Sequence, residues 1–111
     1  MDVGIINYNG GQELATCVRS LLNQSVPVRV FVLDNASSDD SIAELREQHL
    51  DCRIIESCIN LGYAGACNKL LENMDDDIQV LCNMDLEFDS SWAASLQRCF
   101  DHHPEAGSVA S

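Results

Sequence analysis

The sequence contains few basic residues. Its 111 residues include six Lys and Arg against eighteen Asp and Glu, a formal net charge of -12. A protein that binds nucleic acid neutralises phosphates with clustered Lys and Arg, and the six basic residues here are scattered, so we expect no nucleic-acid partner. Most of the acidity is expected to serve solubility. If the ligand is an anion, a bound divalent cation would have to offset the negative charge of the site itself.

Two further patterns are missing. No apolar run approaches the ~20 residues that a membrane-spanning helix needs, and no basic leader with a long apolar stretch opens the chain, so neither a membrane span nor a signal peptide is expected. No G-x-G-x-x-G follows any predicted strand, which argues against a dinucleotide-binding site.

The six cysteines form no C-x-x-C pair, so a structural zinc site is not predicted. Cys17, Cys67 and Cys99 fall on apolar faces of predicted helices, and Cys82 lies in a predicted strand. We therefore expect free thiols that act as small buried apolar groups. Free thiols indicate a reducing compartment, either the cytoplasm itself or its boundary at the inner face of the membrane.

Strand-like and helix-like segments alternate along the chain. Short apolar runs predict strands over Val3–Asn7, Val28–Leu33, Arg53–Glu56 and Ile78–Asn83. Helical spacing predicts four apolar helix faces: Leu14, Cys17, Val18, Leu21 and Leu22; Ile42, Leu45 and His49; Ala64, Cys67, Leu71 and Met74; Trp92, Leu96, Cys99 and Phe100. Asp39 or Ser41 is expected to cap the second helix, and Asp89 or Ser90 the last. This alternation predicts one α/β domain, residues 1–111, with a mainly parallel sheet covered by helices on both faces.

The last residues have the pattern of a strand that has just begun. Gly107–Ser111 would open a fifth strand, yet a strand starting at Val109 would be shorter than the typical ~5–6 residues. We therefore expect a fragment of a longer protein or an unusually short version of one. An exposed sheet edge near Ser111 would favour strand pairing between copies, which makes a homodimer one expectation.

Carboxylates follow two of the predicted strands. Asp34 follows Val28–Leu33, and Asp85 lies just past the fourth strand, with Asn83 and Glu87 beside it. Ligands of open α/β sheets bind beyond the carboxyl ends of the strands. An ionised carboxylate only accepts hydrogen bonds, so Asp34 suits a ring N–H of a base or a ribose hydroxyl. Mg²⁺ and Mn²⁺ take oxygen ligands and phosphates, which suits Asp85. Either acid could instead serve only in a polar turn or a solvated loop.

Two loops are further candidates. Tyr8 ends the first strand, where its ring could stack on a base or simply be a half-buried aromatic. Asn60–Asn68 leads into a helix, and its small residues Gly65 and Ala66 would admit a ligand to backbone N–H groups or permit close helix–sheet packing. The three histidines share no metal-like spacing with the acids and are expected at the surface: His49, His102 and His103.

Four segments in this order resemble the donor-binding half of family 2 glycosyltransferases of the GT-A fold, closest to their rhamnosyltransferase-like branch. The segments are Ile5–Gly11, Val32–Asp39, Asn60–Asn68 and Leu81–Asp85, and the resemblance spans nearly all 111 residues. Each motif alone is modest, but four in register are specific. The sequence departs from the family pattern at Asn83, where many members have an acid, and at Met84, Cys67 and Lys69, where Pro, a small residue and Gly are commoner.

The resemblance implies a site for a UDP-, dTDP- or GDP-sugar. Tyr8 and Asn9 would lie near the base, and Asp34 would hydrogen-bond it. The segment with Asn60, Gly62 and Asn68 would line the base and ribose, Asn83 would stand near the ribose, and Asp85 would hold Mg²⁺ or Mn²⁺ against the pyrophosphate.

The implied reaction inverts the anomeric carbon while a general base activates a hydroxyl of a saccharide or lipid-linked acceptor, as in polysaccharide biosynthesis. That base belongs to the second half of the family's domain, and no residue here corresponds to it, so the catalytic residue is unknown. We expect this chain to bind a nucleotide without completing transfer. A non-catalytic nucleotide-binding or interaction module of the same fold is the alternative. A phosphoacceptor signalling domain is disfavoured because Asn7–Asn9 supplies no acid.

Overall fold

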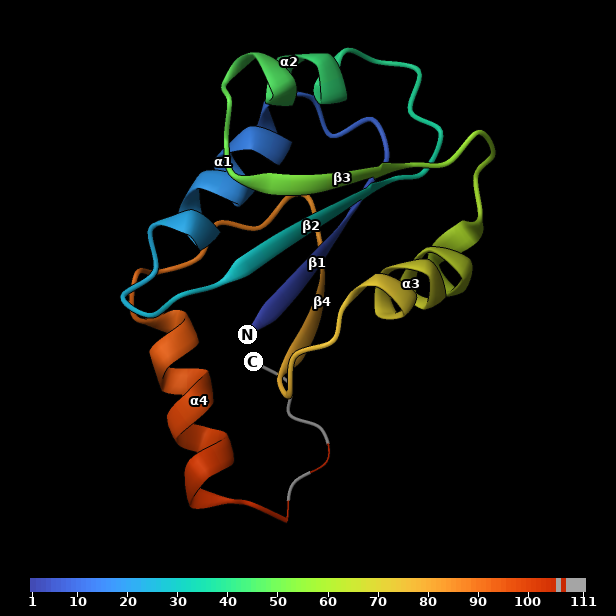
Figure 1. Cartoon of the computed structure of the whole chain (residues 1–111). Helices are drawn as coiled ribbons and strands as arrows, with labels where there is room; N and C mark the ends of the chain where they lie inside the picture. The colour runs from blue at the N-terminus through green and yellow to red at the C-terminus, as the bar shows by residue number, and fades with distance from the viewer. Residues whose placement is uncertain (106, 108–111) are drawn as a thin grey trace.

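The computed structural model of the chain describes residues 1–105 and Gly107. Strands and helices alternate through this part (Figure 1): β1 Asp2–Asn7, α1 Gly11–Leu22, β2 Arg29–Asp34, α2 Ser41–Glu47, β3 Cys52–Glu56, α3 Gly62–Asn73, β4 Gln79–Asn83 and α4 Trp92–His102. All strand pairs are parallel, in the order β3-β2-β1-β4. The predicted α/β class and parallel sheet are confirmed. The predicted fifth strand and the dimer edge near Ser111 lie outside the described residues, apart from Gly107.

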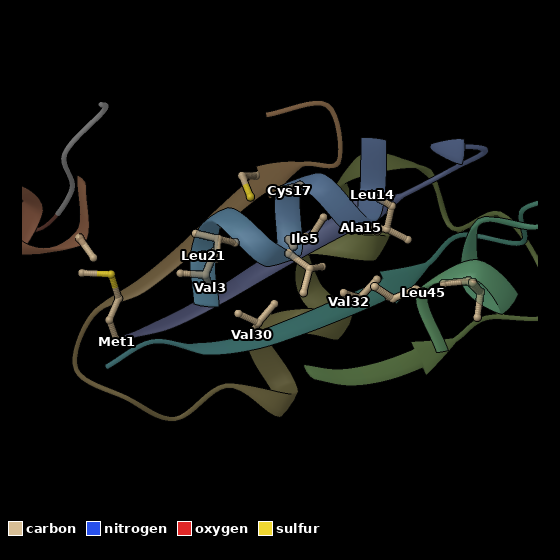
Figure 2. Close-up of a cluster of buried hydrophobic side chains, with 14 of the residues drawn as sticks. Met1, Val3, Ile5, Leu14, Ala15, Cys17, Leu21, Val30, Val32 and Leu45 are labelled. Carbon is tan, nitrogen blue, oxygen red and sulfur yellow. The ribbon is translucent and has the colours of Figure 1, made fainter. Parts of the chain in front are cut away.

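The sheet separates two apolar cores. Helices α1, α2 and α4 cover one face, where Val3 and Ile5 of β1 pack against Leu14, Cys17 and Leu21 of α1 (Figure 2). Helix α3 covers the other face with a smaller core. Because both faces are covered, β1 is buried along its whole length. This burial explains why the central strands are nearly continuous apolar runs rather than alternating ones.

Helix α3 presents a different face from the predicted one. Ala66, Leu70 and Met74 are buried against the sheet, whereas Leu71 is 42% exposed and Ala64 is also exposed. The reason is a close approach at Gly4, where an added Cβ would lie 3.1 Å from Leu70 Cδ1. The prediction of Ala64 and Leu71 as inward residues is therefore wrong, while close helix–sheet packing at Ala66 is confirmed.

Helix α2 is shorter than the spacing predicts. It ends at Glu47, so His49 lies beyond the helix with a left-handed φ of 51° and is exposed. The assignment of His49 to the apolar face is wrong, because a helix that stops two residues earlier cannot turn that side chain inward. The predicted surface position of the three histidines is confirmed, since His102 and His103 are exposed as well.

The predicted capping acids lie just before the N-cap positions, Asp39 by one residue and Asp89 by two. Asp40 and Ser91 occupy the N-cap positions, and neither side chain makes a capping bond. Instead, Asp39 Oδ1 accepts a hydrogen bond from the Ser41 backbone N–H at 3.1 Å, and Asp89 Oδ1 accepts one from Ser91 N–H at 2.9 Å. Asp39 therefore satisfies the first helical N–H group of α2, and Asp89 satisfies the N–H of the N-cap residue of α4, whereas Ser41 and Ser90 do not act as caps.

All six cysteines are free, as predicted. Cys17 and Cys82 are buried on the α1 side of the sheet, where the Cys17 thiol donates to the Asn83 carbonyl at 3.9 Å. The expected burial is wrong for the others, since Cys52, Cys67 and Cys99 are half-buried and Cys58 is exposed. Within residues 1–105 and 107, none of the helices combines the length and apolar character that crossing a membrane requires.

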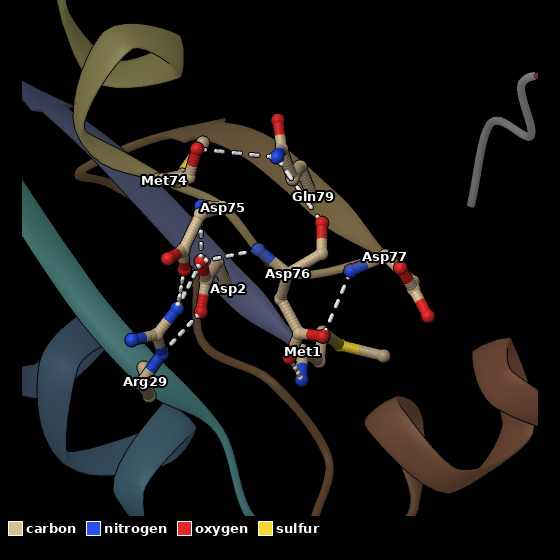
Figure 3. Close-up of polar contacts among 8 residues, drawn as sticks. All are labelled: Met1, Asp2, Arg29, Met74, Asp75, Asp76, Asp77 and Gln79. Atoms are coloured by element: carbon tan, nitrogen blue, oxygen red, sulfur yellow. Dashed lines mark hydrogen bonds and ion pairs between the residues drawn. The ribbon is translucent and has the colours of Figure 1, made fainter.

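The amino edge of the sheet is held by a polar network around Asp2 (Figure 3). The Asp2 side chain is fully buried, and Arg29 donates to its two oxygens through Nε and Nη2, both at 2.7 Å. The backbone N–H groups of Asp75 and Asp76 donate to Asp2 Oδ2 at 3.0 and 3.1 Å. The N-terminal ammonium of Met1 pairs with Asp76, and Arg29 also pairs with Asp75. The network ties β1, β2 and the turn before β4 together.

The same contacts set the ionisation of Asp2. Burial alone raises the pKa of its carboxyl, but the hydrogen bonds from Arg29, Asp75 and Asp76 outweigh burial and hold that pKa below its ordinary value. Asp2 is therefore a paired structural anion at the amino edge, away from the strand ends where ligands of such sheets bind.

Candidate functional site

The carboxyl ends of β2, β1 and β4 lie side by side. In the parallel register, Asn7 of β1 is opposite Asp34 of β2, and Ile6 is opposite Asn83 of β4. Because β1 lies between β2 and β4, Asp34 reaches the edge on one side of it and Asp85 on the other. Both predicted acids therefore belong to one edge of the sheet, separated by the end of β1.

Asp34 is 6% exposed and already holds three hydrogen bonds. Its Oδ1 accepts from Asn7 Nδ2 at 2.9 Å and from Ser37 Oγ at 2.6 Å, and its Oδ2 accepts from the Ser37 backbone N–H at 3.1 Å. Since a carboxylate oxygen has two lone pairs, Oδ1 is filled and Oδ2 keeps one free. The turn that supplies these donors contains Ala36 with a left-handed φ of 64°, a strained conformation for a residue with a Cβ.

Asn7 is the polar residue beside Asp34 that the sequence analysis did not include in the site. Its side chain is fully buried, and Nδ2 also donates to Ser37 Oγ at 3.3 Å and Ser41 Oγ at 2.9 Å. Its Oδ1 has no hydrogen-bond partner among the described residues. Gly10 closes over this oxygen, and an added Cβ there would lie 2.3 Å from it.

The loop after β1 is joined to the loop after β2. Asn9 Oδ1 accepts from the backbone N–H groups of Ser38 at 2.8 Å and Asp39 at 3.3 Å, and Asn9 N–H donates to Ser37 Oγ at 2.9 Å. Asn9 has a left-handed φ of 52°. Asn9 thus uses its side-chain oxygen within the protein, while the neighbouring Tyr8 ring is 48% exposed and available to a ligand.

Asp39 joins the starts of two helices. Its Oδ2 accepts from the N–H of Gly11, the first residue of α1, at 3.0 Å, and its Oδ1 accepts from Ser41 N–H and Ser41 Oγ. The Ser41 hydroxyl is the main cause that lowers the pKa of Asp39, and the backbone N–H groups of Ser41 and Gly11 act in the same direction against the opposing effect of burial. Asp39 is a structural anion that places the loops around Asp34.

The loop before α3 is held by a second residue that the sequence analysis missed. Asn35 is 4% exposed, and its Oδ1 accepts from Leu61 N–H at 2.7 Å while Nδ2 donates to the Gly62 carbonyl at 3.3 Å. Asn60 Oδ1 accepts from Gly62 N–H at 2.8 Å, and Gly62 has a φ of 71° that suits glycine. Gly62 and Asn68 are exposed at the start and in the second turn of α3.

Asp85 lies in the turn after β4, is exposed, and accepts no hydrogen bond from the described residues. Its charge reaches the buried thiol pair: the hydrogen bond to Cys17 and burial raise the pKa of Cys82, and Asp85 adds to the rise. Among residues 1–105 and 107, no three His, Cys, Asp or Glu side chains converge on a possible metal position. The donor set is therefore one free carboxylate, which fits Mg²⁺ or Mn²⁺ only where phosphate or water oxygens complete the coordination.

A hollow of about 770 Å³ runs along the outer edge of β4, with which no described strand pairs. Its wall combines β4, the segment after it and parts of α3 and α4: Tyr63, Leu71, Gln79–Asn83, Leu86–Asp89, Trp92, Leu96, Phe100 and Gly107. Asn83 and Glu87 face this hollow, and Asn83 is exposed. The hollow adjoins the Asp85 side of the edge rather than the Asp34 side.

Solved structures with the same fold include TarS 1-349 from S. aureus, which is 19% identical with a TM-score of 0.81 and matches 93% of this chain and 32% of its own. Its complex with UDP-GlcNAc is 18% identical with a TM-score of 0.82, over 93% of this chain and 31% of that one. The mannosyltransferase PcManGT from Pyrobaculum calidifontis, in complex with GDP-Man and Mn²⁺, is 22% identical with a TM-score of 0.80, over 89% and 31%. The chain thus spans about a third of the length of these structures.

No match was found among curated protein sequences. The solved structures establish the GT-A type of α/β fold that the resemblance implied. The family model described as "Glycosyl transferase family 2" matches residues 2–111, nearly the whole sequence. The chain therefore belongs to glycosyl transferase family 2.

Proposed function

We propose that residues 1–111 bind the donor of a family 2 glycosyltransferase, which moves a sugar with inversion from a nucleotide-diphospho-sugar to an acceptor hydroxyl. The observation that supports this proposal most is the placement of Asp34 and Asp85 on either side of β1 at the carboxyl edge, in a chain that belongs to this family. One edge then offers an acceptor for a base and a carboxylate for a cation that faces the phosphates.

The base would lie on the Asp34 side. Asp34 Oδ2 keeps one free lone pair, and the exposed ring of Tyr8 stands at the end of the neighbouring strand. Uracil, thymine and guanine each carry a ring N–H that can donate to such an oxygen, in keeping with a UDP-, dTDP- or GDP-sugar. Asn60, Gly62 and Asn68 would line the base and ribose from the start of α3, with Asn83 near the ribose. The UDP-GlcNAc and GDP-Man complexes of the two similar structures support this ligand class.

The diphosphate would lie on the Asp85 side. Bound Mg²⁺ or Mn²⁺ would offset the negative charge of the diphosphate as it leaves, and Asp85 would hold the cation. The single free carboxylate fits this role because the phosphates themselves supply further oxygen ligands. The Mn²⁺ in the PcManGT structure supports a divalent cation. We assign neither the acceptor nor the base that activates its hydroxyl to any described residue, and therefore expect residues 1–111 to bind donor without transferring its sugar.

Calorimetry with UDP and dTDP, with and without Mn²⁺, tests the proposal. We expect binding that requires Mn²⁺ and is lost in Asp85→Asn. Glu87→Gln is the matched control, because Glu87 is an exposed acid two residues away in the same segment. Absence of nucleotide binding under every condition would contradict the proposal and favour the alternative of a non-catalytic interaction module. Sugar transfer from a radiolabelled donor by residues 1–111 alone would contradict the restriction to donor binding.

A further inference from the structure

We propose that Asn7 is a positioning residue that orients the Asp34 carboxylate and thereby selects bases with a ring N–H. This inference rests on the proposed function, because it concerns how the same site recognises its nucleotide. It starts from an unusual placement: Asn7 is a fully buried amide at the end of the central strand, and its Oδ1 has no partner among the described residues. A buried acceptor left without a partner costs free energy, so a constraint on the other end of the amide must hold the side chain there.

That constraint is the contact with Asp34. Asn7 Nδ2 donates to Asp34 Oδ1 at 2.9 Å and to Ser41 Oγ at 2.9 Å. The reverse orientation of the amide would place its carbonyl oxygen against a carboxylate that has no hydrogen to give. Asp34 therefore fixes which way Asn7 points, and Asn7 in turn holds the carboxylate at the end of β2. Because Asn7 Nδ2 must face Asp34, Asn7 Oδ1 faces the other way and is left without a hydrogen-bond partner among the described residues, which costs free energy.

Ser37 completes the arrangement. Its hydroxyl donates to Asp34 Oδ1 at 2.6 Å, so Oδ1 receives two donors and is filled. Oδ2 receives only the Ser37 backbone N–H at 3.1 Å. A ligand donor can then reach only Oδ2, in one direction. Without Asn7 and the Ser37 hydroxyl, the carboxylate could rotate and offer either oxygen, and a water molecule could bridge to a base that lacks the N–H.

The consequence is selectivity rather than affinity alone. Uracil donates from N3–H, whereas cytosine has an acceptor at N3 that would oppose the free lone pair of Oδ2. A site built to accept a hydrogen bond rejects an analogue that cannot donate, because its own polar group is left unpaired. A loosened carboxylate loses this discrimination, while general damage to the fold weakens binding of both bases equally.

The experiment measures the ratio of CDP to UDP dissociation constants by calorimetry with Mn²⁺ for the full chain and three variants. Asn7→Leu removes the amide while keeping the branched shape of the side chain. Ser37→Ala removes only a half-exposed hydroxyl and should therefore lower the folding stability less than Asn7→Leu does. Ser38→Ala is the matched control, because the Ser38 N–H and hydroxyl both donate to Asn9 Oδ1, not to Asp34.

We expect the unmodified chain and Ser38→Ala to prefer UDP by about tenfold or more. Ser37→Ala should lower that ratio by about threefold, and Asn7→Leu should bring it to within about twofold of one. If Asn7→Leu does not fold, Ser37→Ala decides the matter. Variants that bind both nucleotides more weakly at an unchanged ratio would overturn the inference and leave a purely structural role for Asn7. A chain that binds neither nucleotide would instead overturn the proposed function.

Discussion

The two edges of the sheet use carboxylates in opposite ways. At the amino edge, the buried carboxylate of Asp2 receives hydrogen bonds from a guanidinium and two backbone N–H groups (Figure 3). At the carboxyl edge, Asp34 keeps one lone pair free, and Asp85 has no hydrogen-bond partner among the described residues. An acid's position in the sequence pattern therefore does not tell a structural carboxylate from one that can accept a ligand. The number of acceptor sites that the protein leaves open separates the two groups.

The largest expected effect is the loss of nucleotide binding when Asp85, at the carboxyl edge, is replaced. Asp85→Asn should weaken Mn²⁺-dependent UDP binding by about 100-fold or more, because the neutral amide is a poor ligand for a hard cation. The free energy of unfolding should change by less than about 0.5 kcal/mol, since no described residue depends on this carboxylate. Calorimetry and urea denaturation measure the two quantities. A variant that unfolds more easily would place Asp85 among the structural acids.

The converse effect belongs to Asp2. Asp2→Asn should lower the free energy of unfolding by about 2 kcal/mol, because the neutral amide keeps only one acceptor oxygen for the N–H donors of the turn before β4 and no charge for the guanidinium of Arg29. Nucleotide affinity of the folded fraction should stay within about twofold. Urea denaturation, followed by calorimetry at a temperature where the variant is folded, tests both halves. Wild-type stability would show that the amino-edge network is dispensable.

The contribution of Asp2 to folding stability should be lost at acid pH. The pKa of Asp2 is lowered in the folded chain, so its stabilising contribution is present above the unfolded pKa of about 4 and is lost as the pH falls through the folded pKa. Stability should therefore drop below about pH 4, and Asp2→Asn should flatten that drop by a part of the ~2 kcal/mol it costs at neutral pH. Urea midpoints from pH 2 to 7 measure it, at about one-unit steps. The pKa values of Asp39, Asp76 and Asp89 are also lowered, and these three carboxyls would account for a remaining slope in the variant.

The smallest effect concerns backbone strain at the carboxyl edge. Ala36→Gly should raise the free energy of unfolding by about 0.5 kcal/mol, because relief of the left-handed Ala conformation exceeds the extra entropy that glycine gives the unfolded chain. Ala43→Gly is the control: Ala43 lies exposed within α2, where glycine should destabilise by about 1 kcal/mol. Thermal denaturation of both variants distinguishes strain from a general effect of glycine.

Much of the frame was predictable from local pattern. Apolar runs placed each strand within two residues of its observed bounds, and the alternation with helices indicated the parallel sheet. The positions of Asp34 and Asp85 at one edge followed from the same pattern. The apolar face of α3 did not, because Ala64 and Leu71 also have helical spacing, and the choice between faces depends on Gly4 in a distant strand.

The hydrogen-bonding roles of the buried amides Asn7 and Asn35 could not be predicted from local sequence pattern, for a different reason. Asn7 and Asn35 act through partners that lie 26 to 34 residues away in the sequence, so neither short spacing nor residue type reveals them. The one available signal was that Asn7 is a polar residue at the last position of a buried strand, directly after the apolar residues Ile5 and Ile6. The roles proposed for the site residues themselves stay predictions until nucleotide binding is measured.

The position of β1 between β2 and β4 also determines an order of assembly. Strand β1 is made first, but its two neighbours follow at very different distances along the chain, with Asn7 opposite Asp34 and Asp2 opposite Gln79. Since closing a longer loop costs more entropy, β1 should pair with β2 before β4. During synthesis on the ribosome, the half of the edge that contains Asp34 would therefore form before the strand that carries the Asp85 turn has emerged. A nascent chain halted before β4 should already protect the amides of β1 and β2 from hydrogen exchange.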